Sequence, residues 1–259
     1  MCLLFVDASV AMIPLKSKED LEVLRVSGRI LARVLKEIQE SIRPGITTER
    51  IDRLAEELIL KENALPAFKG YRGFPANVCT SVNEEIVHGI PGPRSLLEGD
   101  VLSLDLGVNY KGYFSDAAVT VAVGKINSKV KKLIDVTRKS LSEGIKQAQV
   151  NNNLSDISYS IQNYVEKNGF SVVRQFVGHG IGLSLHEDPE IPNFGRPHEG
   201  PLLKSGMVLA IEPMVNMGTW ESEIGDNGWT AVTKDRLPSA HFEHTVAITE
   251  KGPEILTNA

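Results

Sequence analysis

Two carboxylic acids lie close together in a segment with the pattern of a β-hairpin, and they are the first candidates for chemistry. Residues 101–120 read VLSLDLGVNYKGYFSDAAVT, two apolar strands around the turn sequence NYKG. A turn centred between Tyr110 and Lys111 would place Asp105 directly opposite Asp116. Opposed carboxylates in apolar surroundings either share a proton or hold cations between them. A solvated surface hairpin is the alternative, but aliphatic residues flank both acids, so we expect a functional site here.

Three further residues have settings that suit the same chemistry. Glu212 and Glu243 lie in aliphatic segments, and the residues two positions away on the same predicted face are mostly small or hydroxylated. His179 lies in VGHGIG after an apolar strand, where glycines let the backbone carry the imidazole into a tight cavity. Those glycines also resemble a phosphate-binding loop, but no helix pattern follows them. Each acid alone is most simply a surface acid, whereas four carboxylates with one histidine predict a site for hard or borderline divalent cations.

Charge balance indicates how many cations such a site would hold. Four carboxylates carry four negative charges, which two divalent ions would neutralise. Two metal ions roughly 3.5–4 Å apart activate water and stabilise a tetrahedral intermediate, as in aminopeptidases. We therefore predict two divalent ions, and these ligand types do not select among Co, Mn, Fe and Zn.

The elements that must hold these residues are predicted twice along the chain. Apolar residues at steps of three and four predict a long helix that begins at the capping box SKED (17–20) and ends before Pro44, then a second helix over 51–63. After the hairpin, the same pattern predicts helices over 130–148 and 157–168. The predicted strands of the second half cover 171–177, 207–216, 229–233 and 241–249.

A local repeat supports a duplicated fold. GDVLSLD (99–105) and GMVLAIE (206–212) each place a carboxylate six residues after a glycine, at an offset of 107. The second predicted helix of each half aligns at a similar offset, and agreement in type, order and offset predicts duplication. No linker-like composition separates the halves. We therefore predict one pseudo-symmetric α+β domain over 15–259, after an apolar N-terminal extension (1–14) in which Met12 is an alternative start.

Composition excludes several classes of protein. The chain carries 28 basic and 33 acidic side chains, and its net charge of -5 gives no general attraction to nucleic acid. No apolar run approaches the ~20 residues that span a membrane, and the start lacks the basic residues of a signal peptide. Two cysteines, Cys2 and Cys79, are too few for a disulfide framework. These features predict a cytoplasmic protein.

The ordered set of candidate ligands resembles the metal ligands of the methionine aminopeptidases. The motifs that carry this resemblance are NEEIVHGIP (83–91), SLDLGV, FSDAAVTVAVG, FVGHGIGLSLHEDP, GMVLAIEPM, DNGWTAVTKD and FEHTVAIT. They cover the chain from about residue 15 to its end, and no large insertion separates His179 from Glu212, as in the short, bacterial-like type I form. The resemblance implies the pita-bread fold, a curved antiparallel sheet around a central metal site, which agrees with the duplication.

The resemblance also implies a role for each ligand. Asp105 would bind one metal ion, Asp116 and Glu243 would bridge both, and His179 and Glu212 would complete the other. A hydroxide between the metals would attack the first peptide carbonyl, and Glu212 would serve as proton acceptor. His88 and His186 would contact the scissile amide, because neutral imidazoles donate hydrogen bonds to developing charge. A hydrogen-bonded core histidine or a surface histidine is the alternative for each.

The methionine pocket is expected in a long irregular segment, 64–94, which proline and glycine punctuate. Its walls would be Phe68, Tyr71, Phe74, Cys79, His88, Leu185, His186 and Trp229. A thioether suits aromatic walls, since sulfur–aromatic contacts contribute roughly 0.3–1.5 kcal/mol. We expect Cys79 to be a small pocket residue and not a nucleophile. An ordinary aromatic core is the alternative.

The resemblance implies an enzyme that removes the initiator methionine from nascent polypeptides and prefers a small second residue. The implied partners are the N-termini of nascent chains, with the ribosome as a candidate contact, no nucleic acid and no membrane, and the family is mostly monomeric. An Xaa-Pro peptidase of the same fold is one alternative, which usually carries a sizeable extra N-terminal domain. A non-catalytic binding module is the other, and the complete ligand set disfavours it.

Overall fold

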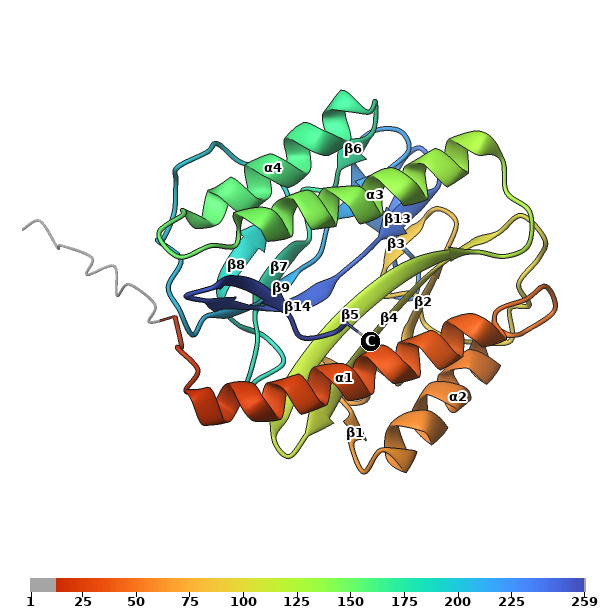
Figure 1. Ribbon diagram of the computed structural model, residues 1–259. Helices are drawn as coiled ribbons and strands as arrows, with labels where there is room; N and C mark the ends of the chain where they lie inside the picture. Colours follow the sequence, from red (N-terminus) through yellow and green to blue (C-terminus); the bar gives the residue numbers. More distant parts are fainter. Residues whose placement is uncertain (1–12, 259) are drawn as a thin grey trace, which may run out of the picture.

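The computed structural model describes residues 13–258, which form two helix pairs and a set of antiparallel sheets (Figure 1). The helices are α1 (Lys18–Ser41), α2 (Thr48–Lys61), α3 (Ser128–Gln147) and α4 (Leu154–Lys167), with a short 3-10 turn η1 (Tyr71–Gly73). The strands are β1 (Leu65–Pro66), β2 (Cys79–Val82), β3 (Glu85–Val87), β4 (Val101–Tyr110), β5 (Tyr113–Ala122), β6 (Ser171–Val172), β7 (Val177–Gly180), β8 (Glu187–Pro192), β9 (Val208–Ile211), β10 (Met214–Asn216), β11 (Ser222–Ile224), β12 (Ala231–Thr233), β13 (Ser239–His241), β14 (His244–Thr249) and β15 (Gly252–Ile255).

Most of the predicted extension, residues 1–12 with the alternative start Met12, lies outside the described residues. Ile13, the first described residue, packs against the core of the second half. Among residues 13–258, no helix has both the length and the apolar character needed to cross a membrane.

In the first half, α1 packs on the long strands β4 and β5, and α2 packs against α1 and β1. The predicted capping box is present, because the Ser17 hydroxyl accepts from the Asp20 backbone and the Asp20 carboxylate accepts from the Ser17 backbone. Strand β4 pairs with β5 on one side, and with β1 and β2 along different parts of its other side. Alternate residues of β4, Leu102, Leu104 and Leu106, are fully buried in the core under these helices.

The second half has the same plan. Helices α3 and α4 pack on each other and cover a core that includes Leu209 and Ile211 of β9 and Val246 and Ile248 of β14. These strands belong to a five-stranded sheet in the order β15-β14-β9-β7-β8. Both helix pairs therefore pack on aliphatic faces, as the sequence predicts, and the alternate strand residues face the other way.

The two halves match in detail. Helices α2 and α4 each have 14 residues, and their N-caps are Thr47 and Asn153, 106 positions apart. Each N-cap residue also forms an isolated antiparallel bridge, Thr47 with Ser95 and Asn153 with Leu202. The partners of these bridges are 107 positions apart, the offset of the sequence repeat. The duplicated α+β architecture is confirmed.

The halves join where β5 meets β13 and β14. The Thr120 hydroxyl both donates to the carbonyl of His241 and accepts from its N–H, each at 2.8 Å. In the same way the Thr245 hydroxyl brackets the backbone of Asp116, at 2.8 and 2.9 Å. Two threonines thus lock the strands that carry the ligands of both halves into one register.

The predicted turn of the first hairpin is wrong by one residue. Tyr110 pairs with Tyr113, so the turn has two central residues, Lys111 and Gly112. Both have positive φ, 53° and 85°, as a type I′ turn requires. Glycine adopts positive φ without strain, so Gly112 takes a central position of the turn and Tyr110 does not.

Several predicted strands of the second half are also corrected. Segment 171–177 is two strands in different sheets, β6 and β7, and His179 lies inside β7 instead of after a strand. Segments 207–216 and 241–249 are each interrupted, at 212–213 and 242–243. The edge strand β8, with sequence EDPEIP, was not predicted, because its charges and prolines mask a strand that its partner β7 holds in place.

Candidate active site

The hairpin β4–β5 presents Asp105 and Asp116 on one face of its sheet. Asp105 pairs with Ala118, and Asp116 pairs with Gly107, so the predicted direct opposition of the two acids is wrong. They are diagonal neighbours instead, because the turn lies one residue later than predicted. Diagonal residues are roughly 7–8 Å apart at Cα, which leaves more space between two carboxylates than direct opposition does.

The imidazole of His179 is oriented by its own strand. Its Nδ1 lies 2.9 Å from the carbonyl oxygen of Gly180. A carbonyl only accepts, so Nδ1 carries the proton and Nε2 has a free lone pair. Nε2 faces the carboxylate of Glu212, 3.6 Å from Oε1. This is the usual way in which a backbone acceptor prepares a histidine to bind a metal ion.

Glu212 and Glu243 lie at the ends of paired strands. The β9–β14 ladder ends with the pair Ile211 and His244, and each glutamate is the next residue beyond that pair. The Glu243 N–H donates to the carbonyl of Ala118 in β5 at 2.9 Å. The two glutamates are therefore brought to the face that carries the two aspartates.

Burial makes these carboxylates hard to ionise alone. Burial, partly offset by other nearby groups, raises the pKa of Asp105 to about 7 and that of Glu212 to about 7. Burial and then the neighbouring acids raise the pKa of Asp116 and of Glu243 well above the ordinary values. Among residues 13–258, no lysine or arginine forms an ion pair with these carboxylates, and only the imidazoles of His179 and His241 approach Glu212.

The donor set fits a divalent metal ion. Asp116, His179 and Glu243 each offer a ligand atom, and these atoms lie within 4.8 Å of one another. Asp105 Oδ1, Asp116 Oδ1 and Glu243 Oε1 are buried with no hydrogen-bond partner in the described part of the chain. Buried oxygens of this kind carry a large desolvation cost that a bound cation removes.

His88 and His186 lie beside the carboxylates as neutral imidazoles. Burial, then the nearby His241, lowers the pKa of His88 to about 4. Burial, then His179 and Arg72, lowers that of His186 to about 3. Near neutral pH both rings therefore have one N–H to donate. His88 also has a φ of 60°, an uncommon conformation outside glycine that frequently marks functional sites.

One hollow of about 170 Å³ brings the whole predicted set together. Its lining includes all thirteen predicted site residues: Phe68, Tyr71, Phe74, Cys79, His88, Asp105, Asp116, His179, Leu185, His186, Glu212, Trp229 and Glu243. On the aromatic side, Phe74 makes edge contacts with Trp229 at 5.3 Å and with Phe68 at 6.5 Å between ring centroids. Tyr71 stacks on His186 at 5.1 Å. An aromatic wall therefore adjoins the ligand cluster directly.

Cys79 is a poor nucleophile in this position. It is 3% exposed and pairs with Asp105 across β2 and β4. Burial, then the charges of Asp105 and Asp116, raises the pKa of its thiol well above the ordinary value. The thiol thus stays protonated, in keeping with a small pocket residue.

Two residues at the site were not predicted. Arg72 also lines the hollow, with its guanidinium 5.4 Å from the centre of the Tyr71 ring. His241 lies behind Glu212, with its Nε2 3.4 Å from Oε2. Arg72 has no signal in the sequence beyond its place in the irregular segment. His241 stands two positions before Glu243 on the same face, which could have identified it.

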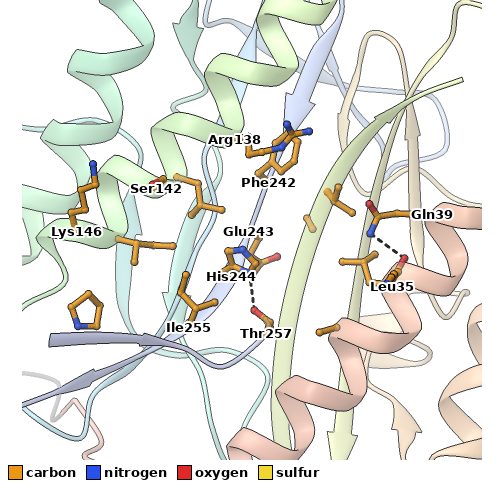
Figure 2. A pocket seen from close by; sticks show the side chains of 17 residues that line it. Leu35, Gln39, Arg138, Ser142, Lys146, Phe242, Glu243, His244, Ile255 and Thr257 are labelled. Carbon is orange, nitrogen blue, oxygen red and sulfur yellow. Dashed lines mark hydrogen bonds between the residues drawn. The ribbon is translucent and has the colours of Figure 1, made fainter. Parts of the chain in front are cut away.

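A larger hollow of about 470 Å³ lies between α1 and α3, and Figure 2 shows its lining. Glu243 contributes to both hollows, but no second ligand candidate accompanies it here. Among the polar groups in Figure 2, His244 Nδ1 pairs with the Thr257 hydroxyl at 2.9 Å, and Gln39 donates to the Leu35 carbonyl. The larger volume of this hollow is therefore no reason to place the reaction in it.

Comparison with known proteins agrees with this geometry. Residues 22–250 match the profile of metallopeptidase family M24. The chain belongs to this family, and its metallopeptidase character, together with the buried cluster of possible ligands, supports the binding of divalent metal.

Within the family, the relatives point to one kind of enzyme. The chain is 56% identical over 246 residues to the methionine aminopeptidase of Clostridium perfringens, covering 95% of this chain and 99% of the relative. It is 52% identical to methionine aminopeptidase 1 of Bacillus subtilis, with the same coverage. The crystal structure of the Thermotoga maritima methionine aminopeptidase matches with a TM-score of 0.94 at 46% identity, over 96% of this chain and 100% of that one. The predicted resemblance and the pita-bread fold are confirmed.

More distant structures share only the fold. A prolidase from Pyrococcus furiosus matches with a TM-score of 0.78 at 24% identity, and the match covers 65% of that chain.

Proposed function

We propose that this chain is a cytoplasmic aminopeptidase that removes the N-terminal methionine of nascent polypeptides, with preference for a small second residue. The observation that carries the proposal is the single hollow in which an aromatic wall adjoins the metal-ligand cluster. Its volume of about 170 Å³ suits one side chain, and an adjoining hollow of about 620 Å³ shares His88, Asp105, His179, His186 and Glu212 with it. The similarity to methionine aminopeptidases over 95% of the chain supports the same activity.

We infer that Asp105, Asp116, His179, Glu212 and Glu243 hold two divalent ions. Four carboxylates balance two dications in charge, and the buried, unpartnered oxygens belong to three of these residues. When bound, the ions would lower the pKa of a water molecule, so that it could lose a proton and attack an amide near neutral pH. Mn, Fe, Co and Zn all suit this mixed oxygen and nitrogen set.

The side chains around the cluster position the peptide and move its protons. His88 and His186 donate hydrogen bonds to the scissile amide and stabilise charge on its oxygen as the tetrahedral intermediate forms. Glu212, which is 13% exposed at its side chain, accepts the proton of the attacking water and returns it to the leaving amine. Phe68, Phe74 and Trp229 hold the methionine side chain by sulfur–aromatic contact.

A peptide panel under controlled metal tests this function. Protein stripped with a chelator should be inactive on Met-Ala-Ser and should recover with Mn²⁺ or Co²⁺, while Leu-Ala-Ser stays a poor substrate. Full activity in chelator would overturn the metal mechanism. Faster cleavage of Ala-Pro-Ser than of Met-Ala-Ser would identify an Xaa-Pro peptidase instead.

A further inference from the structure

His241 is a buried polar ring whose purpose the proposed reaction does not explain. It is 1% exposed, and neither ring nitrogen has a hydrogen-bond partner among residues 13–258. An unpaired buried polar group costs roughly 1–3 kcal/mol, which a leucine or phenylalanine here would avoid. A histidine at this position therefore indicates a polar partner close by.

The partner that the geometry offers is Glu212. His241 Nε2 lies 3.4 Å from Glu212 Oε2, while His179 Nε2 lies 3.6 Å from Oε1 of the same carboxylate. The carboxylate thus lies between two imidazoles, one on each oxygen. The 3.4 Å separation exceeds the 2.7–3.2 Å of a relaxed hydrogen bond. A carboxylate that is ionised beside a metal ion is a stronger acceptor, so we expect this contact to shorten when metal binds.

The backbone of His241 is held more firmly than that of Glu212. The Thr120 hydroxyl brackets both its N–H and its carbonyl, and β13 pairs residue by residue with β10. Glu212 lies one residue beyond the end of its ladder. His241 can therefore act as a fixed point against which a less constrained side chain is oriented.

We propose that His241 is a positioning residue for Glu212, and that its Nε2–H holds Oε2 so that Oε1 stays turned toward Nε2 of His179, where both could hold a divalent ion. It does not line the hollow that receives the peptide, so it acts through Glu212 and not on the substrate. The inference rests on the proposed function only in taking Glu212 as a metal ligand. Without the donor, the carboxylate would rotate freely, and loss of such an outer partner typically costs 10–100-fold in metal affinity.

Metal affinity and ring tautomer test this role separately from turnover. Calorimetric titration of Mn²⁺ into chelator-treated protein should show binding weakened about 10–100-fold in His241→Leu. His241→Gln, which keeps an N–H near the position of Nε2, should stay within about threefold of wild type. The matched control is His244→Gln, which alters a partly buried histidine that pairs with Thr257, and its Mn²⁺ affinity should not change.

The ¹⁵N spectrum of wild-type protein should show the proton of His241 on Nε2. A proton on Nδ1 would overturn the proposal, and so would wild-type Mn²⁺ affinity in a folded His241→Leu variant. The tautomer requires no variant, so the test survives if His241→Leu does not fold. Protein that binds Mn²⁺ but does not cleave Met-Ala-Ser would refute the proposed function and leave both readouts for His241 valid.

Discussion

The two halves of this duplicated fold supply their ligands in different ways. The first half uses an unbroken hairpin of two ten-residue strands, in which Asp105 and Asp116 sit mid-strand. The second half uses a four-residue strand for His179 and the positions just beyond a ladder for Glu212 and Glu243. The first pair is placed by the pairing of its two strands, and the Thr245 hydroxyl adds support at the backbone of Asp116. The second set depends on side-chain and cross-strand support, such as the carbonyl of Gly180 for His179.

This difference indicates that the two halves differ in rigidity. Ladder pairing fixes where the hairpin acids lie, whether or not metal is present. Ligands at strand ends have fewer backbone constraints, so their side chains can adjust when the ions bind and when Glu212 accepts and releases a proton. We therefore expect the first half to act as a rigid frame and the second half to adapt.

The largest effect should come from removing one ligand charge in each half. Asp116→Asn and Glu243→Gln should each lower kcat/KM on the order of 10³-fold, because metal stabilisation of the transition state is worth several kcal/mol. In chelator, both variants should unfold at a higher temperature than wild type, since each removes a buried carboxylate without a partner. Near-normal turnover in either variant would contradict its assignment as a ligand.

The next effect concerns an ion pair that supports the loop of His186. Lys16 Nζ lies 2.5 Å from Glu187 Oε2, with side chains 3% and 10% exposed. Glu187 Oε1 accepts hydrogen bonds from the backbone N–H groups of Leu183 and Ser184, which lie just before His186 in the chain. Lys16→Met leaves this glutamate unpaired, so the free energy of unfolding should fall by about 3–5 kcal/mol.

Activity should fall with it, because the loop that orients His186 loses its anchor. The double variant with Glu187→Gln should regain much of the stability measured by denaturant unfolding, since no buried charge is then left alone. A Lys16→Met variant as stable as wild type would show that the Lys16–Glu187 ion pair does not stabilise the loop that carries His186.

The motifs on single strands could be predicted from sequence, and contacts between strands could not. The candidate ligands could be selected because four strand-associated acids and one histidine have few other uses, and the helices could be predicted because their apolar period and caps are local. The hairpin register failed because it depends on which residues take positive φ, here Lys111 and Gly112. Arg72 was missed because its place beside Tyr71 follows from a distance that no periodicity encodes, whereas the two-residue spacing of His241 from Glu243 was a signal that was not used.

A pair of variants at His88 separates chemistry from backbone strain. Both His88→Ala and His88→Gly should lower kcat about 10²-fold, because each removes the same hydrogen-bond donor. The φ of 60° costs alanine roughly 1–2 kcal/mol and glycine almost none. The glycine variant should therefore be the more stable of the two in thermal unfolding. Equal activity of wild type and both variants would remove His88 from the site.

Hydrogen exchange tests the rigid-frame comparison directly. On adding Mn²⁺ to metal-free protein, the amides of residues 212 and 242–243, which lie between strands, should slow by about tenfold or more, since binding removes local openings there. Amides of β4 and β5 should change little, because their ladder is complete without metal. Equal slowing in both halves would show that the hairpin also adapts, and that the two halves hold their ligands alike.

The smallest effect probes the turn of the hairpin. Gly112 has a φ of 85° and open space around it, so Gly112→Ala should cost about 1 kcal/mol through backbone strain alone. Gly92 also has open space but no positive φ, so Gly92→Ala should change stability by less than about 0.5 kcal/mol. Ten cross-strand pairs fix the register against this strain, so kcat/KM should be unchanged in both variants. A loss of activity in Gly112→Ala without unfolding would show that the turn, and not the ladder, places Asp105 and Asp116.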